Sequence, residues 1–242
     1  MDKDIFLGRV RSALSTGSKE HKASAPRSDA FFRDDDFFRD AVAEIERRSD
    51  VDWEQLYLEL QPTAERMGWK VNRVAGPEDV LEYMESLITK LDAKKLAITV
   101  QDSISDIDVQ KLSDARHVSL TKVTKQLGID DQALRDRVIE ADIGITGVEY
   151  AVVETGTCVI SADSQTGRLV GLTPPVHVVL VRRGQVLASL DDLFAIRRLQ
   201  FVEERMPAYT NLISGPSRTA DIEHTLVTGV HGPGDVHMIL ME

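Results

Sequence analysis

The feature that most constrains the fold of this chain is a repeated strand and helix alternation across residues 69–240. The stretch 69–74 alternates as a strand does, Gly76-Pro77 opens an amphipathic helical pattern, and 96–100 reads as a buried strand. Further strand patterns follow at 118–120, 143–145, 158–160, 176–181, 211–213 and 237–240, with a helical pattern at 131–140. The sequence therefore predicts an α/β fold, with a mainly parallel, twisted sheet flanked by helices. Closely spaced apolar runs around Ala151, Val159 and Val178 also predict an antiparallel addition.

The chain is predicted to have three parts: an N-terminal helix and linker at 1–28, a helical lead-in at 29–68, and the α/β domain at 69–242. The arm combines a short amphipathic helix near Ile5 with a polar linker, and should dock on its own body or on another subunit. In the lead-in, one helix surrounds Phe37-Phe38. A second is expected to open with a capping box of Asp52 and Gln55, to be kinked or interrupted by Pro62 and to end at Gly68.

Composition limits the kinds of partner that this chain could have. With 242 residues and 42% apolar content it can bury a full-size core. Its 29 basic and 40 acidic residues give a net charge of −11, which argues against nucleic acid. No uncharged stretch approaches the roughly 20 residues of a membrane span, and the N-terminus lacks a signal-peptide layout, so we expect a cytoplasmic protein.

The cysteine content restricts redox chemistry. The single cysteine, Cys158, can form neither an internal disulfide nor an iron-sulfur cluster, so any cluster would belong to a partner. Cys158 is expected to be a small core residue. The histidine spacing does not match a helical metal pair, which predicts no metal site, and phosphate-loop and dinucleotide motifs are absent.

Two polar turn clusters, at 154–157 and 214–221, each follow a predicted strand and are interpreted as two walls of one site. In the first, Gly156 permits close backbone approach, and Glu154 could act as acid, base or nucleophile. The alternative is that Glu154 only braces the turn by accepting hydrogen bonds from backbone NH groups.

The second cluster is expected to precede a helix containing Ala220, Leu226 and Val227, whose N-terminus would favour an anion. Arg218 could clamp a carboxylate or phosphate. The alternative is that Thr219 caps the helix while Arg218 pairs with Asp221 or Glu223. His231, in a glycine-rich turn, could donate to a ligand or transfer protons, or could simply satisfy a loop carbonyl.

Three ordered motifs carry a resemblance to a known family. Gly144-Ile145-Thr146-Gly147 leads into the 154–157 cluster, the 214–223 segment follows, and Gly229-Val230-His231-Gly232-Pro233 lies further on. Together they resemble the LUD domain family, in particular its lactate utilization protein C (LutC) members, over roughly 69–240. One departure is Gly234-Asp235, where a basic residue would be expected.

The resemblance implies a fold of the NagB/RpiA/CoA-transferase-like group. It also implies a LutC-like subunit of a cytoplasmic system that oxidises L-lactate to pyruvate with iron-sulfur partner proteins. It assigns no stand-alone activity and no cofactor to this chain, and a homo-oligomer is compatible with it. Glu154 is the candidate catalytic residue. The candidate contacts to a small anionic ligand are Thr146, Gly147, Thr155, Gly156, Thr157, Ser214, Gly215, Ser217, Arg218, Thr219, Asp221, His231 and Gly232.

A second hypothesis of a different class stays open beside this one. The chain could be a non-catalytic protein that binds a metabolite or assembles a complex through its N-terminal arm. A stand-alone isomerase or CoA-transferase is a third possibility, which rests on fold analogy alone.

Overall fold

The protein is described here by a computed structural model that covers residues 35–123, 131–161, 165–220 and 226–242. Residues Phe38–Glu242 form one compact unit. The predicted arm at 1–28 lies outside the described residues.

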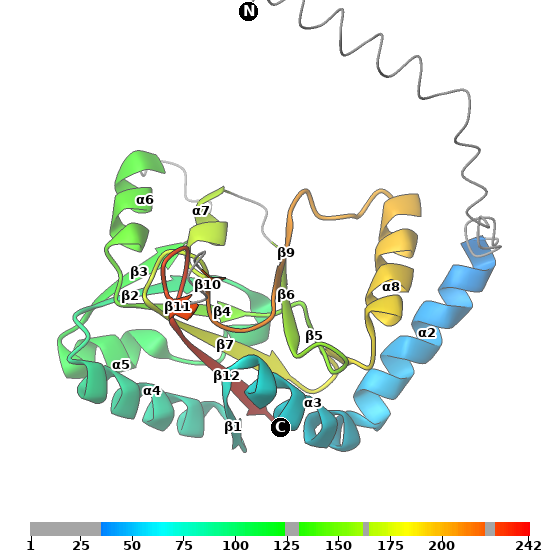
Figure 1. The fold of residues 1–242 in the computed structure, drawn as a ribbon, viewed down its shortest axis with the longest axis horizontal. Coiled ribbons are helices and arrows are strands. Elements are labelled where there is room, and N and C mark those ends of the chain that lie inside the picture. Colours follow the sequence, from blue (N-terminus) through cyan, green and yellow to red (C-terminus); the bar gives the residue numbers. More distant parts are fainter. Residues whose placement is uncertain (1–34, 124–130, 162–164, 221–225) are drawn as a thin grey trace, which may run out of the picture. The chain divides into compact units, whose positions relative to one another are not determined.

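The centre of this unit is a parallel six-stranded sheet, as the sequence predicts (Figure 1). Apolar runs form its inner strands because both faces are covered, so neither face needs polar side chains. In spatial order the strands are β1 (Lys70–Val74), β12 (Asp235–Met241), β7 (Val176–Arg182), β4 (Ile143–Gly147), β2 (Lys95–Thr99) and β3 (Ser119–Val123).

A four-stranded sheet and a small hairpin complete the strands. The four-stranded sheet has the order β8 (Val186–Leu187), β5 (Tyr150–Val152), β6 (Thr157–Ser161) and β9 (Thr210–Ile213). Its β5–β6 and β6–β9 pairs are antiparallel, which confirms the predicted antiparallel addition, although β7 belongs to the parallel sheet. The hairpin pairs β10 (Arg218–Ala220) with β11 (Leu226–Thr228).

Helices cover both faces of the parallel sheet. One face packs against α4 (Pro77–Leu91) and α5 (Val109–Arg116). The other face packs against α3 (Trp53–Met67), the four-stranded sheet and α6 (Asp131–Ile139). The far side of the four-stranded sheet packs against α2 (Asp35–Val51) and α8 (Leu190–Val202). The short helices are η2 (Asp102–Ile104) and α7 (Gln165–Leu169).

Helix α3 corrects two expectations about the lead-in. Asp52 stands at its N-cap, but the Asp52 side chain makes no capping hydrogen bond, and the Gln55 amide donates to Glu59 instead, so the predicted capping box is wrong. Pro62 lies inside the helix without ending it. Pro62 and Leu58 are both on the exposed side, so the carbonyl that loses its helical partner can be hydrated. Gly68 ends α3 as predicted.

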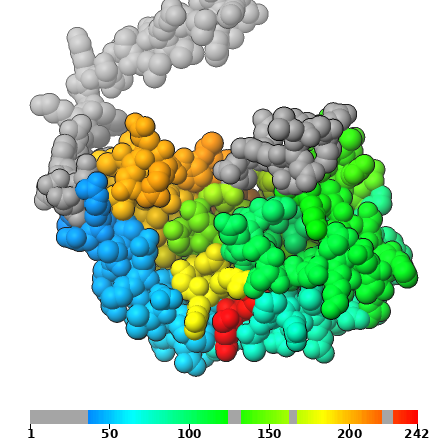
Figure 2. Space-filling view, turned by 180° about the vertical axis from the view of Figure 1, so that it is seen from behind, coloured from blue at the N-terminus to red at the C-terminus, as the bar shows by residue number. Residues whose placement is uncertain are grey.

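The last strand, β12, lies inside the parallel sheet between β1 and β7. Its final residue, Met241, pairs with Val74 on one side and with Arg182 on the other. In the space-filling view the end of this strand (red) reaches the surface beside the residues that follow β7 (yellow) (Figure 2). No helix among the described residues is both long and apolar enough to cross a bilayer.

Candidate functional site

The first predicted cluster is the turn between β5 and β6, and it is held firmly against α3. Gly156 has a φ of +60°, and a Cβ added there would lie 3.0 Å from Ala64 Cα, so any other residue would be strained and tightly packed there. The carbonyl of Gly156 accepts a hydrogen bond of 3.0 Å from the Trp69 indole Nε1. Trp69 precedes β1, which places this turn at the amino end of the parallel sheet.

Hydroxyl groups join the two predicted clusters. Thr155 Oγ1 and Ser214 Oγ each lie 2.7 Å from the Oγ1 of Thr157, whose side chain is buried. We call Thr155, Thr157 and Ser214 the hydroxyl cluster. The structure therefore brings the 154–157 turn and the start of the 214–221 segment into direct contact, as the sequence predicts.

The backbone after Ser214 fits closely against the end of α3. Gly215 has a φ of +113°, and a Cβ there would lie 2.4 Å from the Met67 carbonyl oxygen. The same Met67 oxygen accepts a 2.9 Å hydrogen bond from Arg218 Nη2. A cation at the C-terminus of a helix is favoured by the helix dipole. The described contact of Arg218 is thus structural.

Ser217 fastens the loop that carries His231. Its backbone NH donates to the Pro233 carbonyl at 2.8 Å, and its carbonyl accepts from the Gly229 NH at 2.9 Å. Its hydroxyl accepts from the His231 NH at 3.2 Å, and Gly232 packs beside its Cβ. His231 is exposed. Ser217, His231 and Gly232 therefore lie together at the start of β12.

The helix predicted after Thr219 is wrong. Arg218–Ala220 and Leu226–Thr228 are antiparallel strands, and Thr219 pairs with Val227. The β-branched residues Thr219, Val227 and Thr228 favour a strand, and this preference overrides the cap-like serine and threonine signal. No helix N-terminus is therefore described here that could attract an anion, and Thr219 caps no described helix. Asp221 and Glu223 lie outside the described residues.

Glu154 is exposed and contacts the start of α8. Its Oε2 accepts a 3.0 Å hydrogen bond from the NH of Leu190, the first residue of that helix. Ser189 and Asp192 form a capping box at the same helix end. Glu154 thus accepts from a backbone NH, as the alternative interpretation expects, but the donor belongs to α8 and not to the 154–157 turn. A part for Glu154 in any chemistry stays a prediction.

A buried histidine lies on the sheet face that carries the four-stranded sheet, and the sequence analysis did not single it out. His177, on β7, is fully buried, and its Nε2 lies 2.9 Å from Thr146 Oγ1. Burial, together with His237, lowers the pKa of His177 to about 3, so the ring is neutral. Its Nδ1 is buried without a hydrogen-bond partner among the described residues. The sequence signal that could have identified this residue is a histidine inside the apolar run 176–181.

A second polar group lies on the opposite sheet face. Tyr83 OH lies 2.6 Å from Nδ1 of His237, and Nε2 of His237 lies 3.1 Å from Asp235 Oδ1. Lys70 Nζ lies 2.5 Å from Asp235 Oδ1. Burial lowers the pKa of His237, while Asp235 opposes that shift. The neighbouring strand β1 thus places a basic residue, Lys70, against Asp235, but its charge is paired with that carboxylate.

An ion pair fixes α8 to the turn after β4. Arg197 NH groups donate to both carboxylate oxygens of Glu149 at 2.8 and 2.7 Å, and Ser161 also donates to this carboxylate. Burial opposes ionisation, but these hydrogen bonds lower the pKa of Glu149. Single-sequence patterns could not pair residues so far apart.

Gly147 does not join the hydroxyl cluster. It pairs with Leu180 on β7, whereas the β12 residue Asp235 pairs with Val176. Four strand residues, at about 3.3 Å each, separate these levels by roughly 13 Å. Gly147 NH donates to Gln101 Oε1 at 2.8 Å, so Gly147 lies at the carboxyl end of the sheet.

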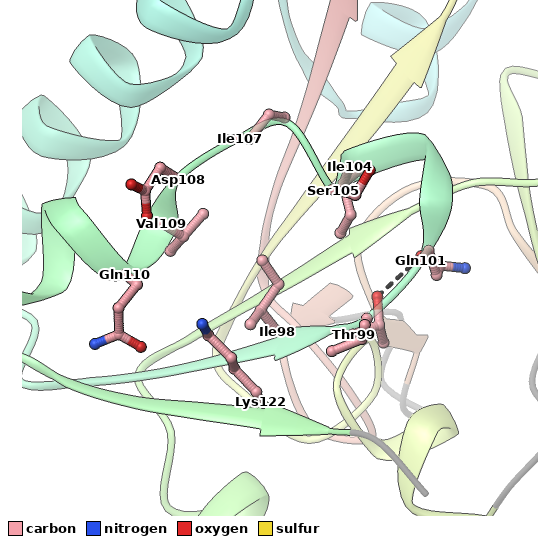
Figure 3. Close-up of a pocket in the computed structure, with 11 residues that line it drawn as sticks. Ile98, Thr99, Gln101, Ile104, Ser105, Ile107, Asp108, Val109, Gln110 and Lys122 are labelled. Atoms are coloured by element: carbon pink, nitrogen blue, oxygen red, sulfur yellow. Dashed lines mark hydrogen bonds between the residues drawn. The ribbon is translucent and has the colours of Figure 1, made fainter.

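The carboxyl end carries a hollow of about 420 Å³ between β2, β3 and the segment 104–110 (Figure 3). We call it the edge cavity. Its apolar lining includes Ile98, Ile107 and Val109, and its polar lining includes Ser105, Asp108, Gln110 and Lys122. The sequence analysis missed it because the lining comes from separate elements. Among the described residues, no group of three or more His, Cys, Asp or Glu side chains could hold a metal ion.

These features define an α/β protein with a covered parallel sheet, a hydroxyl cluster at its amino end and a cavity at its carboxyl end. A family model described as "LUD domain" matches residues 58–241, and the chain belongs to that family.

Individual proteins resemble this chain as well. A "Lactate utilization protein C" of Halalkalibacterium halodurans is 34% identical over 164 residues, which cover 64% of this chain and 71% of that protein. "Lactate utilization protein C 1" of Bacillus mycoides is 29% identical over 182 residues, covering 74% and 76%. A crystal structure of a DUF162 family protein from Deinococcus radiodurans has a TM-score of 0.45 at 18% identity, covering 78% of this chain and 98% of that one.

Proposed function

We propose that this chain takes part in lactate utilization, as a subunit of a cytoplasmic system that oxidises L-lactate to pyruvate with iron-sulfur partner proteins. The observation that carries the proposal is the LUD domain match, which extends over nearly all of the α/β domain. The printed names of the two relatives agree with it. The proposal concerns a role within a system and assigns no reaction to this chain alone.

The proposal that iron-sulfur clusters belong to partner proteins is based on the single cysteine of this chain. Cys158 is the one cysteine of the chain, and it is fully buried in β6. Burial raises the pKa of its thiol well above the ordinary value, so it is a poor metal ligand and a poor nucleophile. Clusters held by several thiolates would therefore belong to other proteins.

The ligand is proposed to be a small carboxylate or phosphate bound beside the hydroxyl cluster and the Ser217 loop. Thr155, Thr157 and Ser214 supply hydroxyl groups, and the loop adds the backbone NH of Gly232 and the imidazole of His231. Hydroxyl and NH groups that converge at one place are suited to an anion. Glu154 is retained as the candidate acid, base or nucleophile at the margin of this site.

A second candidate function is favoured by the way these groups are already used. The three hydroxyls bond to one another, Arg218 bonds to Met67, and Glu154 bonds to the start of α8. Polar groups satisfied within the fold suit a non-catalytic assembly or metabolite-binding protein.

The test is complementation of a host strain that lacks this chain, with growth on L-lactate as the sole carbon source. The full chain should restore growth and should copurify with proteins that contain iron and labile sulfide. Growth of the deletion strain at the normal rate would refute the role in lactate utilization. Restoration by Glu154→Gln, together with loss on deletion of residues 1–28, would favour assembly over chemistry.

A further inference from the structure

We propose that the edge cavity binds a small carboxylate that carries a hydroxyl group. In this site Lys122 holds the carboxylate and the Gln110 amide oxygen accepts a hydrogen bond from the ligand hydroxyl. The inference goes beyond the proposed function, which places an anion at the hydroxyl cluster and involves no residue of this cavity.

The cation of the site is Lys122 on β3. Lys122 pairs with Ile98 in the parallel register, so both side chains lie on the α5 face of the sheet. Figure 3 shows its ammonium group directed into the cavity towards the segment 107–110. Within the part of the chain that the structure describes, Lys122 has no hydrogen-bond or ion-pair partner.

The nearby carboxylate does not take the place of a ligand. Asp108 also lines the cavity, but its Oδ1 caps α5 by accepting from the Lys111 NH at 3.0 Å. In a chain with a net charge of −11, acidic groups are in excess, yet none of the described ones pairs with Lys122. A cation left open in a concave site favours a negatively charged ligand.

Acceptor groups beside the cation narrow the ligand class. The Gln110 Nε2 donates to the Asp114 carboxylate at 2.9 Å, which leaves the Gln110 amide oxygen on the Lys122 side (Figure 3). The Ser105 hydroxyl donates to the Asp102 carbonyl at 2.9 Å, so its oxygen is also an acceptor for the cavity. A hydroxycarboxylate matches both kinds of group, because its carboxylate can accept from Lys122 and its hydroxyl can donate to one of these oxygens.

The remaining wall fits a short carbon body. Ile98, Ile107 and Val109 are 7%, 5% and 3% exposed and form the apolar side of the hollow. The cavity of about 420 Å³ lies at the carboxyl ends of β2 and β3. Open parallel sheets place ligands at this edge, because the loops that follow the strands can shape a crevice there.

The test is a backbone-amide NMR titration of the full chain with three probes: L-lactate, propionate and inorganic phosphate. L-lactate should shift amides of residues 98–110. Propionate, which has the same carbon count but no hydroxyl, and phosphate should bind there more weakly. Lys122→Gln should weaken L-lactate binding at these amides by about tenfold or more, because a charge-assisted hydrogen bond is lost. The matched control is Lys111→Gln, a neighbouring exposed lysine outside the lining, which should bind as the parent does.

Each other outcome is informative. Absence of L-lactate-induced shifts at 98–110, or unchanged binding in Lys122→Gln, would overturn the inference and leave Lys122 as a charge that protects the edge strand β3. Equal or stronger binding of propionate or phosphate would remove the hydroxyl assignment and overturn the ligand class. Shifts confined to 214–234 that disappear in Ser217→Ala would support the hydroxyl cluster of the proposed function and refute the edge cavity.

Discussion

The two ends of the parallel sheet use their polar groups in opposite ways. At the amino end, the hydroxyl cluster is internally hydrogen-bonded, Arg218 donates to Met67, and Ser217 holds the loop at His231. At the carboxyl end, the edge cavity leaves Lys122 without a partner among the described residues and turns an amide oxygen of Gln110 towards it. Most of these polar groups at the amino end are therefore used within the fold, whereas at the carboxyl end one cation has no partner among the described residues.

The largest expected effect comes from Gly215→Ala at the amino end. The positive φ and the 2.4 Å approach of a Cβ to Met67 oxygen predict a loss of about 2–4 kcal/mol in the free energy of unfolding. Urea unfolding measures it. Gly76→Ala is the matched control, because nothing lies within 4 Å of an added Cβ there, and it should cost about 1 kcal/mol or less. Equal losses in both variants would show that the close fit at Met67 does not matter.

A pH dependence should follow from His177. Its folded pKa, lowered to about 3, lies below the unfolded value near 6.5, so the unfolded chain binds more protons between these values. The stability contribution is fully present above pH 6.5 and is lost as the pH falls towards 3, at about 1.4 kcal/mol per pH unit at most. Unfolding free energies at pH 7 and pH 5 should therefore differ by roughly 2 kcal/mol from this residue.

Substitution separates this contribution from other titrations. His177→Gln should flatten the pH 5 to 7 slope, while the exposed His117→Asn, at the C-cap of α5, should keep the parental slope. An unchanged slope in His177→Gln would contradict a neutral, buried ring.

Thr157→Val should have the next largest effect. It removes the hydroxyl that joins Thr155 to Ser214 while keeping the buried shape, and should cost about 1–2 kcal/mol. Ser105→Ala at the carboxyl end removes one exposed hydroxyl and should cost about 0.5 kcal/mol or less. Thermal and urea unfolding of the two variants compare the two ends of the sheet directly. A larger loss of stability in Ser105→Ala would show that the hydroxyls at the carboxyl end stabilise the fold more than those at the amino end.

Among the substitutions at the amino end, Glu154→Gln is expected to have the smallest effect on stability. The amide keeps an oxygen that can accept from Leu190 but loses the charge at the N-terminus of α8, which should cost about 0.3–1 kcal/mol. Growth on L-lactate then separates the two roles of this residue. Normal growth would identify a brace, whereas loss of growth in a stably folded variant would support chemistry.

Much of the fold could be predicted because local patterns and tertiary structure agree. The apolar runs 96–100 and 176–181 predict buried parallel strands, and Gly68 and Gly76-Pro77 mark the end of α3 and the start of α4. The same local signals failed at 214–221, where serine, proline and threonine suit a helix start and a hairpin equally. Pairing with the strand β11 favours the hairpin over the helix, and the residues 214–221 alone do not show that this partner strand exists.

The candidate site was predictable only in part. Thr157 and Ser214 meet because Thr157 begins β6 and Ser214 follows β9, which is the antiparallel neighbour of β6. The pairing of His177 with Thr146 depends on the register between β7 and β4, and the edge cavity depends on the path of the chain between β2 and α5. Neither can be read from spacing, because both depend on which elements pack together.

The interior position of β12 has a consequence for biosynthesis. Strand β1 can pair with β12 only after β12 has been synthesised. Lys70 and Asp235, which are hydrogen-bonded across these strands, are 165 positions apart in the sequence. During translation, the nascent chain will carry β1 and β7 with open edges until residues 235–241 leave the ribosome. Since such distant pairing slows folding and exposes unpaired strands, ribosome-bound chains stalled before this point should be chaperone clients.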